Sequence, residues 1–117
     1  MKIVFPYGKT HLTYDFDEVN VLTSSIEAYD PGKSESQLVA EAMAAPVGGI
    51  KLQELVKDQQ NIVIIASDHT RPVPSKVIMP PMLAAIREGN PNADITILIS
   101  TGCHRETTRE ELIGKFG

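Results

Sequence analysis

The sequence has a single cysteine, Cys103, and no long apolar run. One cysteine excludes an internal disulfide framework, so we expect a protein of the reducing cytoplasm. No stretch approaches the roughly 18 consecutive apolar residues that a membrane-spanning helix needs. The N-terminal stretch MKIVFPYGK lacks the apolar segment of a signal peptide, so we expect no secretory leader.

Clustered positive charge is also missing. The 117 residues include 11 Lys and Arg against 15 Asp and Glu, which gives a net charge of −4, and the basic residues are scattered. Nucleic acids and anionic membranes bind clustered Lys and Arg, so we expect neither as a partner. The patterns G-x-G-x-x-G and G-x-x-x-x-G-K-[ST] are absent as well, which excludes these dinucleotide and P-loop signatures.

What is present is typical of one globular domain with a hydrophobic core, with 42% apolar and 22% charged residues. The opening KIVFPYGKTHLTYDF predicts two short strands around a turn at Gly8, within a hairpin region of about residues 1–24. Residues 20–24 fit either a third strand or an extended segment. Asp30-Pro31-Gly32 then predicts a turn.

Two short helices are expected next. Ser34 and Gln37 have the spacing of a capping box, and the helix that follows should end before Pro46. Residues 50–58, IKLQELVKD, predict a second, amphipathic helix.

The second half predicts a βαβ unit. NIVIIAS (61–67) and DITILIS (94–100) are β-branched runs typical of parallel strands covered on both faces. A helix between them should end at Gly89, and Pro80 and Pro81 should break or kink it. The fold class is therefore α/β, a small Rossmann-like domain with a parallel βαβ core at about residues 61–117.

The end of the chain predicts one more helix. Thr107 and Glu110 have capping-box spacing, and the helix after them ends at Phe116-Gly117 with no further strand. We therefore expect residues 1–117 to be the N-terminal α/β domain of a longer, two-domain chain.

Polar residues follow both predicted strands. Asp68, His69, Thr70 and Arg71 leave the first strand, and His104 lies in the loop that leaves the second. Carboxyl ends of neighbouring parallel strands meet at one edge of a sheet, where open α/β sheets bind their ligands. We therefore expect Asp68, Arg71 and His104 to share one cleft.

The first loop leaves alternatives open. Asp68 could cap the following helix, and Arg71 could form either a surface ion pair or a bidentate clamp for an anion. Thr70 could cap or could donate to a phosphate, and His69 fits an ordinary loop histidine. Lys76 fits a residue at the start of a helix.

The second loop holds the best candidate for proton transfer. His104 has a reference pKa near neutrality, although it could simply donate to a carbonyl. Cys103 and His104 together are too few ligands for a zinc site. From these residues alone, the chain is an α/β domain with a polar site at two strand ends.

The motifs SDHTRPVPSK and STGCHRETTREELIGKFG, preceded by NIVII and ITILIST, resemble the N-terminal part of the nickel-dependent lactate racemase family. The stretch from Pro46 to Leu55 is similar as well. The resemblance is specific because both motifs occur at the right separation, whereas either motif alone would be weak evidence for the family.

The resemblance implies an isomerase that racemises or epimerises small, lactate-like 2-hydroxy acids. The implied cofactor is a nickel pincer nucleotide, a nickel-carrying pyridinium-3,5-bisthiocarboxylate mononucleotide that accepts a hydride from the substrate. Residue by residue, Asp68, His69, Thr70 and Arg71 would bind the cofactor, Arg71 would also face the substrate carboxylate, and His104 would be one of two acid/base histidines.

Two features depart from the family pattern. Glu106 stands where the family often has proline, and Cys103 fills a variable position.

The second acid/base histidine, the lysine that tethers the cofactor and the nickel ligand would lie outside this chain, so no metal ligand is expected in it and the chain alone is expected to be inactive. Its partners would be a 2-hydroxy acid and the remainder of its own polypeptide. The alternative is a non-catalytic α/β module that binds a phosphate or carboxylate at the strand ends.

Overall fold

Alternating apolar residues at the start of the chain form a β-hairpin in the computed structural model, which describes residues 1–117. Strands β1 (Lys2–Tyr7) and β2 (Thr10–Asp15) are antiparallel. Gly8 has φ 58°, the left-handed conformation that a tight two-residue hairpin loop favours. The predicted hairpin is confirmed.

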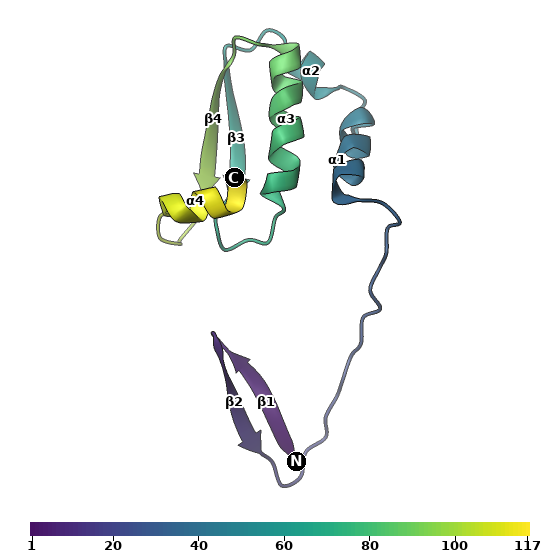
Figure 1. Ribbon diagram of the computed structural model, residues 1–117, viewed down its shortest axis with the longest axis vertical. Helices are drawn as coiled ribbons and strands as arrows, with labels where there is room; N and C mark the ends of the chain where they lie inside the picture. Colours follow the sequence, from purple (N-terminus) through teal and green to yellow (C-terminus); the bar gives the residue numbers. More distant parts are fainter. The chain divides into compact units, whose positions relative to one another are not determined.

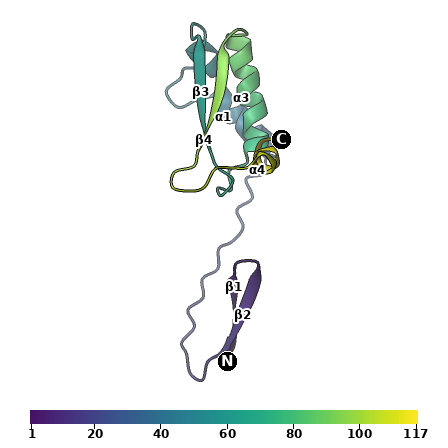
Figure 2. The same cartoon turned by 90° about the vertical axis from the view of Figure 1, so that its left-hand side faces the viewer.

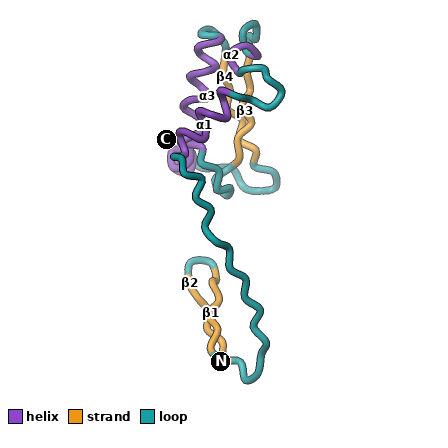
Figure 3. Tube along the Cα trace, turned by 90° about the vertical axis from the view of Figure 1, so that its right-hand side faces the viewer, coloured by secondary structure: helices purple, strands orange, loops and turns teal.

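The hairpin belongs to the first of two compact units, Met1–Asp30, and the second is Pro31–Gly117. No helix or strand lies between β2 and α1 (Glu35–Ala44), and Figure 3 shows this segment as loop. Residues 20–24 therefore form no third strand, which was one of the two structures that their sequence allowed.

The second unit contains the predicted βαβ unit. Strands β3 (Asn61–Ser67) and β4 (Asp94–Ser100) pair in parallel, with Ile62 opposite Ile95. Helix α3 (Ser75–Gly89) connects them and lies along one face of the sheet (Figures 1 and 2). The predicted α/β fold with a parallel sheet is confirmed.

The other face of this sheet is bare. Val63, Ile65 and Leu98 are 59%, 71% and 53% exposed. The expectation of strands covered on both faces is therefore wrong for this unit. The physical reason is that the unit's helices lie on the α3 side or at the strand ends, as Figure 1 shows, so that none covers the second face.

Helix α3 carries most of the core. Met79, Ala85 and Ile86 are buried, and they are joined by Val56 and Ala93.

The helix runs without interruption through Pro80 and Pro81, so the predicted break is wrong. These prolines remove only the amides that would reach the carbonyls of Lys76 and Val77, near the start of the helix.

Three shorter helices complete the unit. Helix α1 begins with the predicted capping box of Ser34 and Gln37, and α2 is a single turn, Leu52–Leu55, shorter than expected. Both pack against α3. Helix α4 (Arg109–Phe116) is capped by Thr108 with Glu111, one residue later than predicted.

Candidate functional site

Two loops at the carboxyl ends of β3 and β4 build the candidate site. The first begins at Asp68 and leads into α3, and the second begins at Thr101 and leads into α4. Because β3 and β4 are paired in parallel, both loops leave the sheet at the same edge. The topology therefore brings together residues that are far apart in the sequence.

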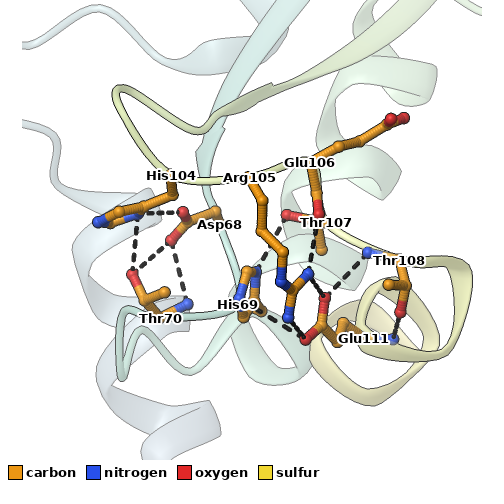
Figure 4. Close-up of polar contacts among 9 residues, drawn as sticks. All are labelled: Asp68, His69, Thr70, His104, Arg105, Glu106, Thr107, Thr108 and Glu111. Atoms are coloured by element: carbon orange, nitrogen blue, oxygen red, sulfur yellow. Dashed lines mark hydrogen bonds and ion pairs between the residues drawn. The ribbon is translucent and has the colours of Figure 1, made fainter.

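Asp68 is the buried centre of this edge, with 1% exposure. Its Oδ1 accepts hydrogen bonds from the Thr70 hydroxyl at 2.7 Å and the Thr70 backbone N–H at 3.0 Å, and its Oδ2 accepts from His104 (Figure 4). The Thr70 hydroxyl and then the His104 ring hold the pKa of the Asp68 carboxyl well below its usual range. Asp68 is therefore an anion at neutral pH.

Asp68 does not cap the next helix. Helix α3 has Pro74 at its N-cap position, with no side-chain hydrogen bond there. Of the two roles that the sequence left open for Asp68, the geometry thus supports a role within the site.

His104 lies 2.6 Å from Asp68, measured from Nδ1 to Oδ2. An ionised carboxylate can only accept, so Nδ1 carries a hydrogen and Nε2 of the neutral ring has the free lone pair. Nε2 has no partner in the structure, and the side chain is 36% exposed. This ring is therefore held in the tautomer that can take a proton at Nε2.

A cleft of about 420 Å³ lies at these strand ends, and Asp68, Arg71 and His104 all line it. The predicted convergence of the three residues is confirmed, whereas their chemical roles stay predictions. The Arg71 guanidinium makes no hydrogen bond or ion pair within the chain, and Ser67, another lining residue, has an Oγ that is buried without a hydrogen-bond partner. The cleft thus offers a free cation to a ligand.

The side chain of His69 has different partners from that of its neighbour Asp68. Its Nδ1 lies 3.2 Å from Thr107 Oγ1, and its Nε2 lies 3.6 Å from Glu111 Oε1 (Figure 4). His69 lines a second cavity and not the cleft of Asp68 and His104. Thr107, predicted as a helix cap, is instead a buried partner of this ring.

An ion pair that the sequence analysis did not identify fixes the second loop. Arg105 donates to Glu111 through Nη2 at 2.6 Å and through Nη1 at 2.9 Å. The Arg105 guanidinium and the Thr108 amide lower the pKa of Glu111 to about 2, and Glu111 in turn raises the pKa of Arg105. The pair ties the residue after His104 to α4, which restrains the loop that carries the histidine.

Metal binding does not fit the chain by itself, since no group of three or more His, Cys, Asp or Glu side chains could hold an ion. An anionic organic ligand fits better, because the Arg71 guanidinium is unpaired in the cleft. None of the helices combines the length and the apolar composition of a membrane-spanning segment.

The fold and the cleft define an α/β domain with a histidine–carboxylate pair and a free arginine at the ends of two parallel strands. Residues 7–117 match the lactate racemase N-terminal domain family, and the chain belongs to that family. The resemblance inferred from the two motifs is thereby confirmed.

Two relatives and one solved structure agree with this assignment. The chain is 44% identical over 118 residues to the lactate racemase of Thermoanaerobacterium thermosaccharolyticum and, equally, to that of Lactiplantibacillus plantarum, with 98% of this chain and 28% of each relative covered. The lactate racemase apoprotein structure from T. thermosaccharolyticum matches with a TM-score of 0.72 and 42% identity, covering 100% of this chain and 27% of that one. The chain thus spans little more than a quarter of the length of these relatives.

Proposed function

We propose that this chain is the N-terminal part of a lactate-racemase-type isomerase and supplies one acid/base group of its active site. The observation that carries the proposal is the Asp68–His104 contact of 2.6 Å at the edge of a cleft that Arg71 also lines. The family match supports the isomerase class. The second acid/base group and the residues that tether the cofactor would come from the rest of the polypeptide.

In this proposal the substrate is a small 2-hydroxy acid such as lactate. Arg71 binds its carboxylate, since a guanidinium presents two parallel N–H groups to a carboxylate. His104 accepts the hydroxyl proton at Nε2 and returns it. Asp68 keeps Nδ1 protonated and stabilises the imidazolium that forms, as buried carboxylates do beside catalytic histidines.

The cofactor of the proposed reaction is the nickel pincer nucleotide. The loop of Asp68, His69, Thr70 and Arg71 would hold it, chiefly through Arg71, whose charge is free in the cleft, whereas the His69 ring lines the second cavity. When bound, the cofactor supplies the two-electron acceptor for the hydrogen on the substrate's carbon. We place the protein in the cytoplasm, where its one exposed cysteine, Cys103, would stay reduced.

The test is racemisation of lactate by the full-length, cofactor-loaded protein, followed by chiral chromatography. His104→Ala should lower turnover by about 10²-fold or more, the usual contribution of a general acid or base. Glu106→Ala is the matched control, because Glu106 is an exposed residue of the same loop whose side chain points away from Asp68 and His104 in Figure 4. The control should keep normal turnover.

The isolated chain should not racemise lactate. Turnover by residues 1–117 alone, or normal turnover of the full-length His104→Ala protein, would contradict the proposal. If the full-length protein has no isomerase activity on any 2-hydroxy acid and yet binds carboxylates through Arg71, the non-catalytic binding module is the correct function.

A further inference from the structure

The His69 side chain connects the two loops of the candidate site without lining the cleft. Its Nδ1 lies 3.2 Å from the hydroxyl oxygen of Thr107, which is buried, and its Nε2 lies 3.6 Å from Oε1 of Glu111. The His69 side chain is only 20% exposed, so most of the ring is withdrawn from solvent. His69 belongs to the first loop, whereas Thr107 and Glu111 belong to the second loop and to α4. The ring therefore spans from one loop of the site to the other.

Glu111 joins the two loops a second time. Asp68-His69 and His104-Arg105 are two pairs of consecutive residues, one in each loop, and they are linked twice (Figure 4). The first link is the hydrogen bond of 2.6 Å between Asp68 and His104. The second is Glu111, whose Oε1 lies close to His69 Nε2 and accepts from Arg105 Nη2 at 2.6 Å. The second link thus restrains the residue that follows each member of the first.

The partners of His69 define a tautomer opposite to that of His104. The ion pair with Arg105 lowers the pKa of Glu111 to about 2, so at neutral pH its carboxylate is ionised and favours a hydrogen on the nearer ring nitrogen, Nε2. Nδ1 of the neutral ring then accepts the hydroxyl hydrogen of Thr107. The His69 ring therefore has no free lone pair with which to take a proton from a ligand.

We propose that His69 is a positioning residue for His104 and does not itself contact substrate or cofactor. Its contacts with Thr107 and Glu111 hold the second loop against the first, so that the His104 ring meets Asp68 in the correct place. Placement matters because a displacement of about 1 Å can cost about 10²-fold in rate. This role deepens the proposed function and rests on it, since the placement serves proton transfer at His104. It also removes His69 from the cofactor contacts that the resemblance implied.

The first experiment is racemisation by the full-length, cofactor-loaded protein, measured by chiral chromatography over a range of lactate concentrations. His69→Ala should lower kcat at least about tenfold and leave KM within about twofold, because Arg71 still binds the carboxylate. His69→Asn keeps a polar atom close to the position of Nδ1 and should retain most of the turnover. His11→Ala is the matched control, since it removes an imidazole from an exposed position of the hairpin and should change neither value.

The second experiment is nitrogen-15 NMR of the histidine rings in the same protein, which does not depend on turnover. His104 should have Nδ1–H in the wild type and a mixture of tautomers in His69→Ala. Thr107→Val keeps the shape of the side chain and should act in the same direction, so it provides the test even if His69→Ala does not fold. The double variant should be no worse than the more affected single variant, because the two residues act as one unit.

The outcomes separate this inference from the proposed function. An unchanged His104 ring in the folded variants would overturn the inference, and weaker cofactor binding alongside it would make His69 a ligand contact. A changed ring with normal turnover would overturn the positioning role and leave His69 a structural residue. If the wild type racemises no 2-hydroxy acid while the ring still changes in His69→Ala, the proposed function fails and the placement of His104 by His69 stands.

Discussion

Asp68 and His104 lie on different loops, and their side chains meet at 2.6 Å between Oδ2 and Nδ1. Asp68 is buried, and its lowered pKa keeps it ionised throughout the neutral range. A permanent acceptor at this position fixes the hydrogen of the His104 ring on Nδ1.

We therefore expect Asp68→Asn to disturb the tautomer of His104 while the fold is kept, because asparagine has the same shape without the charge. Nitrogen-15 NMR of the histidine ring should report Nδ1–H in the wild type and a mixture of tautomers in the variant. In the full-length protein, turnover should fall by about 10²-fold or more. An unchanged tautomer together with unchanged turnover would show that Asp68 only stabilises the loop.

The lowered pKa of Glu111 predicts how the free energy of unfolding depends on pH. Arg105 and the Thr108 amide depress its folded pKa to about 2, below the ordinary value of 4.5. A depressed carboxyl pKa contributes stability that is present above pH 4.5 and is lost as the pH falls toward 2. Glu111→Gln keeps an acceptor for the helix cap and removes the charge, so wild type and variant should differ at neutral pH and converge in acid.

Urea denaturation across this pH range measures the difference. Glu110→Gln is the matched control on the same helix turn, since Glu110 is exposed and Arg105 pairs with Glu111 instead. A Glu111→Gln effect that stays constant down to pH 2 would refute the linkage with Arg105.

Thr107 and Thr108 should respond differently to substitution. Thr108 caps α4 by accepting the Glu111 amide at 3.3 Å, so Thr108→Ala should cost about 1 kcal/mol of unfolding free energy. Thr107→Val keeps the shape and removes only the hydroxyl that meets His69 at 3.2 Å. Helix content by circular dichroism should drop in the first variant and not in the second; the reverse would place the cap at Thr107.

Gly89 and Gly114 form a second matched pair. A Cβ on Gly89 would lie 2.3 Å from the backbone oxygen of Gln53, whereas a Cβ on Gly114 meets nothing within 4 Å. Gly89→Ala should force α2 away from α3 and cost about 1–3 kcal/mol, the usual range for overpacking. Gly114→Ala lies inside α4 and should stabilise it by up to about 1 kcal/mol. Thermal unfolding of both variants tests the contact, and a tolerated Gly89→Ala would contradict it.

The sequence predicted the elements whose signals are local. Both strands of the parallel sheet and the Ser34 cap were found because β-branched runs and cap spacing act within a few residues. The cap of α4 was placed one residue early because TTREE allows two capping boxes in adjacent registers. The choice depends on Thr107 being buried against His69, a contact across 38 residues.

The site was predictable to the extent that it follows from topology. Because β3 and β4 are parallel, Asp68, Arg71 and His104 lie at the same edge of the sheet, and this placement does not depend on contacts between their side chains. The contacts of Arg105 with Glu111 and of Lys115 with Arg71 depend on where α4 packs, and no pattern in the sequence indicates that.

The bare face of the β3–β4 sheet has a practical consequence. Val63, Ile65 and Leu98 point away from the core of their unit, and each strand has one edge without a hydrogen-bonded neighbour. An apolar surface with open strand edges recruits other chains. The chain purified by itself should therefore self-associate, so that its light scattering rises with protein concentration. Ile65→Lys places a charge on the bare face and should reduce this association.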